Sequence, residues 1–298
     1  MHLAVQLTLA SLSQQVLVGL AETTTLFIVS SGLSLVLGVL RIPNISHGAL
    51  YMLGAFLAYS ITRMLGGTAA GFFASLLLAP LAVAFISLVV ERFLLSRLYE
   101  RDHLMLLLFT FALALVFNDL VNIVWGAGYR SMQLPSMFQG SFSFSGLFLP
   151  RYSLFLLCVG PLVAIGLWFL INRTKIGKIS RAAAVHREMV GAVGINVSWV
   201  FAAVFMIGCF LAGLGGSLVA PTQSITQGMD ASIIIEAFLI VIMGGLGNVW
   251  GALLGSLIFG LTDSLGVLIW PQFSIVFPYA AVIVVLLLRP AGLLRSTW

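Results

Sequence analysis

The chain has 298 residues, of which 61% are hydrophobic and only 8% are charged, and its mean hydropathy is +1.15. Soluble globular proteins carry about 25% charged residues, so this chain lacks the polar side chains that a water-exposed surface needs. The composition excludes cytosolic enzymes, nucleic-acid-binding proteins and disordered scaffolds, and it indicates an integral membrane protein. The net charge of +5 fits the excess of Lys and Arg that membrane proteins carry on their cytoplasmic side.

Nine apolar segments are predicted to be membrane helices, because about 20 apolar residues are needed to cross the hydrocarbon core. In chain order they are residues 16–40, 47–65, 71–94, 104–125, 152–172, 198–220, 231–244, 249–269 and 273–288. Strands of a membrane barrel would be about ten residues long and would alternate in polarity, and these segments do neither. The sequence therefore predicts an all-α, polytopic bundle of eight or nine transmembrane helices that forms a single domain over residues 1–298.

The loops between these segments differ in positive charge. Eleven Lys and Arg residues fall in one set of loops and three in the other, which places the first set in the cytoplasm. With nine segments, the C-terminus is then inside and the N-terminus outside. Two loops are long: the outer loop 126–151, which is a structured cap or an inert connector, and the inner loop 173–197.

Two of the apolar segments are interrupted. Segment 231–244 spans only about 21 Å at 1.5 Å per residue, and the sequence GGLGN follows at 244–248. Segment 16–40 breaks at residues 41–44 and resumes after His47 and Gly48. Broken apolar segments near both ends of a chain are typical of discontinuous helices, with a possible inverted repeat. Two tight cytoplasmic turns are the alternative.

The inner loop contains a predicted helix over residues 180–193, with Gly194 at a natural stop. Small and apolar residues recur at three- and four-residue spacing and alternate with Arg181, Arg187 and Glu188. Such an amphipathic helix either lies at the membrane surface and binds anionic lipid, or it couples the chain to a cytoplasmic motor subunit.

Small residues at four-residue spacing suggest close helix packing. Gly247, Gly251 and Gly255 form one such run, and Gly208 and Gly216 belong to another around Ala212. They pack within the chain, or they form a dimer interface or a moving gate helix.

Polar residues inside the apolar segments are costly and usually face a cavity or a partner. They include Glu22, Asp119, Glu236 and Asp263. They are isolated along the sequence, which disfavours a proton relay. The sequence contains no catalytic constellation, no metal-ligand spacing and no GxxxxGK[ST] phosphate loop, so ATP hydrolysis would require another polypeptide.

Four motifs together resemble the permease subunit of a branched-chain amino acid ABC importer. They are GLSLVLGV (32–39) leading into PNISHGALYMLGA (43–55), RAAAVHREMVGAVGINV (181–197), GGLGN (244–248) with Gly251 and Gly255, and LRPAGL (288–293). They occur in the family's order over about residues 14–295, and the length is similar to that of the shorter permease of the pair. The sequence differs from the family where Asn248 replaces the usual Ser and where IPNISH replaces a more common NFAH.

The resemblance implies a non-enzymatic permease in a bacterial inner membrane that carries branched-chain amino acids, or a related small amino acid or amide. Its expected partners are a second homologous permease in a heterodimer, two cytoplasmic ATPases that bind the ATP, a periplasmic binding protein and membrane lipid. This chain itself is expected to bind no cofactor, metal or nucleic acid. An ATP-independent secondary transporter or channel is the alternative.

The glycine spacing, the intramembrane acids and the resemblance together suggest roles for individual residues. Coupling to the ATPase is expected at Arg181, Ala184, Arg187, Glu188, Met189 and Gly194. The pathway or its gate is expected at Asn44, His47, Gly48, Glu236, Gly244, Gly245, Gly247 and Asn248, and helix packing at Gly208, Gly216, Gly251 and Gly255.

Overall fold

The computed structural model describes residues 9–99, 101–144 and 147–294, and most of them are helical. The α-helices are α1 (Leu9–Leu40), α2 (Ser46–Met64), α3 (Ala69–Phe93), α4 (His103–Trp125), α5 (Arg151–Arg173), α6 (Lys175–Val185), α7 (Arg187–Ala192), α8 (Val197–Val219), α9 (Met229–Gly244), α10 (Val249–Ile269) and α11 (Val276–Leu288). Short 3-10 helices are η1 (Leu95–Leu98), η2 (Ser136–Phe138) and η3 (Pro271–Phe273). The strands β1 (Ser141–Phe144) and β2 (Leu147–Pro150) form an antiparallel hairpin.

Six helices in the described part of the chain are long and apolar enough to cross a membrane: α1, α3, α4, α5, α8 and α10. Helix α11 is apolar but has only 13 residues, and α9 has 16. The prediction of an all-α, polytopic membrane bundle is confirmed. The small β-hairpin lies in the predicted outer loop 126–151, so the described part of this loop is structured.

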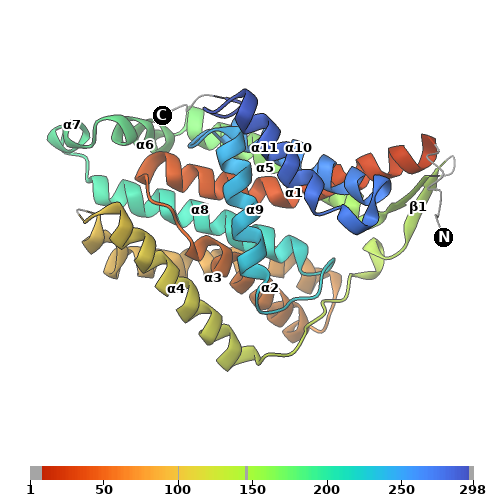
Figure 1. Ribbon diagram of the computed structural model, residues 1–298. Coiled ribbons are helices and arrows are strands. Elements are labelled where there is room, and N and C mark those ends of the chain that lie inside the picture. Colours follow the sequence, from red (N-terminus) through yellow and green to blue (C-terminus); the bar gives the residue numbers. More distant parts are fainter. Residues whose placement is uncertain (1–8, 100, 145–146, 295–298) are drawn as a thin grey trace.

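The bundle is built around α1 and α8, which contact each other along much of their length. Helix α1 also packs against α10 and α5, while α9 runs steeply across the direction of α1 and α8 (Figure 1). Helices α6 and α7 lie at one end of the bundle and the β-hairpin at the other (Figure 1). These ends are called the α6–α7 end and the hairpin end below.

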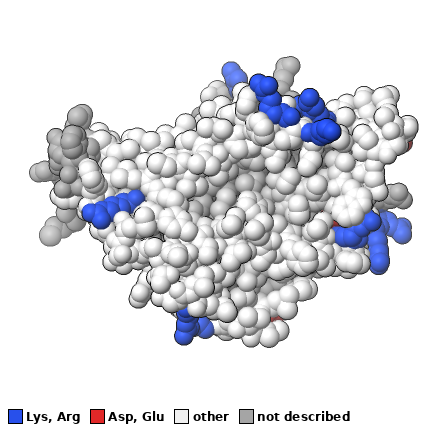
Figure 2. Space-filling model, turned by 180° about the vertical axis from the view of Figure 1, so that it is seen from behind, with Lys and Arg blue, Asp and Glu red and all other residues white. Residues whose placement is uncertain are grey.

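Large apolar side chains cover the outer faces of the peripheral helices. Phe85 of α3 is 66% exposed, Leu162 of α5 73% and Leu287 of α11 77%. On the face shown in Figure 2, Lys and Arg side chains lie around the rim and the broad middle is uncharged. A surface of this kind is stable against lipid tails and not against water, so the chain is a multi-pass membrane protein.

The prediction of a single helix over residues 180–193 is wrong. Helix α6 ends at Val185, His186 adopts an extended backbone conformation with φ −137° and ψ 75°, and α7 begins at Arg187. The change of direction lets Val190 be buried and places the Arg187 guanidinium 5.2 Å from the ring centre of Phe201 in α8. Tertiary contacts with α8 therefore override the local helical pattern. Gly194, with φ +85°, ends the segment as predicted.

The glycines singled out for packing all contact helices of the same chain. Gly208 packs on Gly32 of α1, and a Cβ atom on Gly216 would overlap the carbonyl oxygen of Tyr51 in α2. Gly251 and Gly255 of α10 pack on Gly244 and Ile240 of α9. These contacts bring helix backbones closer than side chains would permit.

Candidate translocation site

The chain between α1 and α2 is a break inside the bundle. Residues 41–44 are not helical, and α2 begins at Ser46, beside α1 rather than beyond its end. The His47 ring donates from Nε2 to the carbonyl oxygen of Val29 at 3.0 Å. His47 and Asn44 are fully buried. The predicted interruption of the apolar segment at residues 41–44 is confirmed, and Ile42 and Asn44 within it are buried.

The backbone of this break is hydrogen-bonded by a side chain from α4. Thr110 Oγ1 donates to the carbonyl oxygen of Pro43 at 3.2 Å and accepts from the amide of Ile45 at 3.3 Å. The Ser46 hydroxyl donates to Asn44 Oδ1 at 2.6 Å. Non-helical backbone at membrane depth requires such partners because lipid offers none. No local sequence pattern identifies Thr110, since its partner segment lies more than 60 residues away.

Helix α9 begins next to the start of α2. Gly48 lies so close to the backbone carbonyl of Asp230 that a Cβ atom would overlap it. Asn118 of α4 donates from Nδ2 to the Asp230 carboxylate at 2.6 Å. Asn118 thereby links α4 to the first turn of α9. Gly228 is the N-cap of α9, with φ +91° and no side-chain capping bond.

The turn between α9 and α10 is also built on close contacts. Gly245 and Gly247 have φ values of +107° and +77°, which favour glycine. Asn248 Oδ1 accepts from the amides of Trp250 at 2.9 Å and Gly251 at 3.1 Å, so it caps α10. Gly244 packs against Gly251 across the turn. This turn is closely packed, and Gly247 lies in it rather than in the packed face of α10.

A cavity of about 380 Å³ lies between α1, α2, α9, α10 and α11, together with the loop that precedes α9. Its polar lining includes three carboxylates, from Glu22, Glu236 and Asp263, and the phenol of Tyr51. Glu22 is exposed and the other two carboxylates are half-buried. These acids are far apart in the sequence, which predicts that they are isolated. That prediction is wrong, because folding brings them from three helices into one cavity.

The register of α1 against α10 explains how two of these acids meet. Gln15 Nε2 donates to the carbonyl oxygen of Ser264 at 2.8 Å, and the Ser264 hydroxyl donates to the carbonyl oxygen of Gln15 at 2.7 Å. Further along α1, Thr23 Oγ1 donates to the carbonyl oxygen of Ser256 in α10 at 3.3 Å. These antiparallel contacts align Glu22 with Asp263 on the cavity side.

The electrostatics of the cavity are one-sided. Lys, Arg and His are absent from its described lining residues. Glu22 and Glu236 each interact electrostatically with Asp263, and Glu236 also interacts with Glu22. Carboxylates that interact in this way repel one another when they are charged. The cavity therefore attracts positive charge and disfavours anions.

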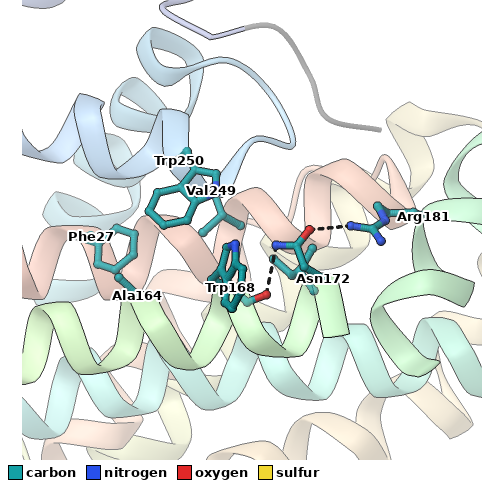
Figure 3. Close-up of a pocket in the computed structure, with 8 residues that line it drawn as sticks. Phe27, Ala164, Trp168, Asn172, Arg181, Val249 and Trp250 are labelled. Carbon is teal, nitrogen blue, oxygen red and sulfur yellow. Dashed lines mark hydrogen bonds between the residues drawn. The ribbon is translucent and has the colours of Figure 1, made fainter. Parts of the chain in front are cut away.

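At the α6–α7 end, most of the predicted coupling residues have partners within the chain. Arg181 donates to Asn172 Oδ1 at 3.0 Å, and Arg41 donates to the carbonyl oxygen of the buried Ala184 at 3.2 Å. Arg181 and Asn172 also border a second cavity of about 150 Å³ between α1, α5 and α10, beside the indoles of Trp168 and Trp250 (Figure 3). Glu188 and Met189 are exposed, and Met189 is 65% accessible.

A polar cluster joins this end to α3. The Tyr99 hydroxyl donates to Glu91 Oε1 at 2.5 Å, and the Arg187 guanidinium lies 6.0 Å from the Tyr99 ring centre. Burial and the Glu91 carboxylate raise the pKa of Tyr99 above its ordinary value, so the hydroxyl stays protonated and donates. Arg187 thus connects α7 to two other parts of the bundle.

Comparison with known proteins identifies the family. The sequence model of the family described as "Branched-chain amino acid transport system / permease component" matches residues 15–286. The chain belongs to this family.

Its relatives are similar over nearly their full length. The high-affinity branched-chain amino acid transport system permease protein BraD of Pseudomonas aeruginosa is 27% identical over 293 residues, which cover 94% of this chain and 95% of BraD. LivH of Salmonella typhimurium, a permease protein of the same description, is 26% identical over 94% of both chains. The probable permease LivH of Methanocaldococcus jannaschii is 24% identical, over 92% of this chain and 89% of its own. The relatives are permease proteins rather than enzymes.

The predicted pathway residues of this permease divide into two groups. Glu236 lines the acidic cavity. The other seven lie in or next to the two interruptions of the helices: Asn44 in the break before α2, His47 and Gly48 in the first turn of α2, Gly244 at the end of α9, and Gly245, Gly247 and Asn248 in the turn before α10. Glu22 and Asp263 were visible in the sequence as intramembrane acids but had no assigned place in the pathway. Tyr51 gave no signal, since a tyrosine in an apolar helix is ordinary.

Proposed function

We propose that this chain forms the membrane pathway of an ATP-driven importer for branched-chain amino acids. The observation that carries the proposal is the family match over residues 15–286, on a chain whose described helices form a membrane bundle with a polar cavity. The relatives BraD and LivH are named as permeases of branched-chain amino acid transport. The chain would be a subunit of a bacterial inner-membrane complex.

The excess of positive charge supports an orientation with the α6–α7 end in the cytoplasm. Lys175, Lys178, Arg181 and Arg187 all lie in α6 and α7. The N-terminus and the β-hairpin would then lie on the periplasmic side, and the C-terminus on the cytoplasmic side. The cavity, which Val219 and Gln223 border at the opposite end of α8, would lie toward the periplasmic side.

The complex would contain a second homologous permease, two cytoplasmic ATPases and a periplasmic binding protein. ATP would be bound by the ATPases, since this sequence has no phosphate-binding loop. Exposed Ile235 and Ile242 lie along one side of α9, next to the cavity, and offer an apolar surface for the second permease. The binding protein would select the substrate, so the permease needs only a weak site.

Coupling is assigned to α6 and α7. Exposed Val185, Met189 and Val193 offer an apolar surface to the ATPase, while Arg181 and Arg187 bind other parts of this chain. Movement of α7 would then be transmitted through Arg187 to α8 and α3. The breaks at residues 41–45 and 245–248 would let α2 and α9 tilt, opening the pathway to each side in turn.

Uptake tests the function directly. Cells lacking this gene are compared with cells that express it from a plasmid, using radiolabelled leucine, isoleucine and valine. Uptake should depend on the chain, and a purified sample should contain an ATPase and a second permease. Flux in liposomes that contain this chain alone and no ATP would contradict the proposal.

Charge reversal tests the coupling assignment. Arg187→Glu combined with Glu188→Lys should abolish uptake while ATP hydrolysis continues and the permease still inserts. Met189→Glu, at a position whose side chain is 65% exposed, should weaken assembly with the ATPase. Arg151→Glu, at the hairpin end, is the matched control and should leave ATPase assembly intact. Normal uptake by the double variant would contradict the assignment.

A further inference from the structure

The acidic cavity lacks a positive partner of its own. Glu22, Glu236 and Asp263 lie on three different helices, and the described residues that line the cavity include no Lys, Arg or His. No hydrogen bond to any of the three carboxylates is found among the described residues. Intramembrane carboxylates usually pair with a cation or mark a substrate or ion path. Their convergence without a partner indicates that a cation enters from outside the chain.

Tyr51 points independently to a ligand. Its side chain lines the cavity and is only 4% exposed, and its ring packs against α8 at Gly215. A buried phenol normally has a hydrogen-bond partner. Within the described residues the Tyr51 hydroxyl has none, although it lies close enough to interact electrostatically with Glu236. It is therefore available to a polar group of a bound molecule.

Apolar side chains make up much of the rest of the lining, beside the polar Thr25, Gln223, Ser232 and Tyr279. Leu26, Ile233 and Phe259 contribute to it, together with Val219, Met229, Ile275 and Pro278 from the hairpin-end side. The volume of about 380 Å³ lies within the range of small-molecule pockets. A ligand that fits this cavity has a positive group for the carboxylates and a compact aliphatic part for the apolar lining.

We propose that the cavity binds the primary ammonium group of the transported amino acid, with the carboxylates of Glu22, Glu236 and Asp263 around it. The Tyr51 hydroxyl donates to the substrate's own carboxylate, and the aliphatic side chain lies against the apolar lining. This assignment rests on the proposed import of branched-chain amino acids. It makes the permease selective for a charged amine, beyond the selection made by the binding protein.

The site is tested with L-photo-leucine, a diazirine analogue that keeps both charged groups. The permease is purified with the proteins that accompany it, placed in lipid nanodiscs and irradiated, and the labelled residues are mapped by mass spectrometry. Labels should fall on cavity residues of α9, α10 or α11. Excess isopentylamine, which has the ammonium group alone, should compete, and 4-methylpentanoate, which has the carboxylate alone, should not.

Isosteric variants test the individual carboxylates. Glu236→Gln and Asp263→Asn should each lower labelling about tenfold, the loss expected for one hydrogen bond to a charged group. Asp119→Asn, an exposed acid of α4 outside the cavity, is the matched control and should label like the wild type. The competition experiment uses the wild-type chain, so it remains decisive if a variant fails to fold.

Several results would overturn the assignment. The first is competition by 4-methylpentanoate as strong as that by isopentylamine. The second is labelling of both cavity variants at the wild-type level, or labels that fall outside the cavity or are absent. The third is loss of labelling in the presence of sodium but not of choline, which would indicate a site for a metal cation. Leucine uptake is measured in parallel in whole cells. If wild-type cells take up no branched-chain amino acid, the proposed function fails. If Glu236→Gln with Asp263→Asn takes up leucine normally, only the ammonium site fails.

Discussion

Two polar regions of this permease lie inside the helix bundle and differ in how far their groups are hydrogen-bonded within the chain. In the break before α2, Thr110 bonds the backbone of Pro43 and Ile45, and His47 bonds the carbonyl of Val29. In the acidic cavity, Glu22, Glu236 and Asp263 interact electrostatically with one another and with Tyr51 and Tyr279, and none of the three carboxylates has a hydrogen bond among the described residues.

This difference distinguishes polar groups that hold the fold together from polar groups that are available to bind a ligand. A polar group in lipid costs free energy unless it is paired. Backbone groups that find partners within the chain fix an irregular backbone, so the backbone of the break is a structural element, although Asn44 Nδ2 and His47 Nδ1 have no partner among the described residues. Groups that find none are costly to keep, so their presence indicates an external partner. Changes in the break should reduce stability, whereas changes in the cavity should alter binding while stability is retained.

The largest effect on stability is expected at Gly48, where α2 meets α9. Gly48→Ala places a Cβ atom against the Asp230 carbonyl and should cost about 3 kcal/mol, at the upper end of overpacking effects. Thermal unfolding in detergent measures this change. Gly166→Ala in α5, where a Cβ atom meets nothing within 4 Å, is the control and should be neutral or stabilising. Equal stability of the two variants would contradict the close packing of α2 and α9.

A smaller loss is expected at Thr110. Thr110→Val removes the hydroxyl that bonds Pro43 and Ile45 and should cost about 2 kcal/mol, since buried backbone groups lose their partner. Thr262→Val is the matched control, because the Thr262 hydroxyl bonds only carbonyl oxygens of its own helix. The same unfolding assay should show a clear difference between them. A Thr110 variant as stable as the control would mean that the break is held by packing alone.

The smallest effect on stability is expected in the cavity. Glu236→Gln removes one of three mutually repelling carboxylates, so the melting temperature should stay the same or rise. Asp119→Asn, outside the cavity, again serves as the control. A loss of stability as large as that of Thr110→Val would show that Glu236 is a structural residue and would remove the contrast between the two regions.

The sequence was sufficient for the membrane class, the family and the discontinuous character of the chain at residues 41–44, because these depend on composition and local pattern. It was insufficient for contacts between distant helices. The reciprocal bonds between Gln15 and Ser264 set the register that brings Glu22 to Asp263, and no local pattern encodes them. The break at His186 escaped prediction for the same reason, since contacts of α7 with α8 determine it.

The most direct test asks whether substrate passes through the acidic cavity. Ser232 is exposed and lines the cavity, and Ser232→Cys can be modified with a charged methanethiosulfonate reagent before leucine uptake is measured. The wild-type chain is the control, because its exposed cysteine, Cys158, lies on α5 outside the cavity. Modification should block uptake by the Ser232 variant alone, and excess leucine should slow the block. Uptake that continues at the wild-type rate after complete modification of the variant would contradict a pathway through this cavity.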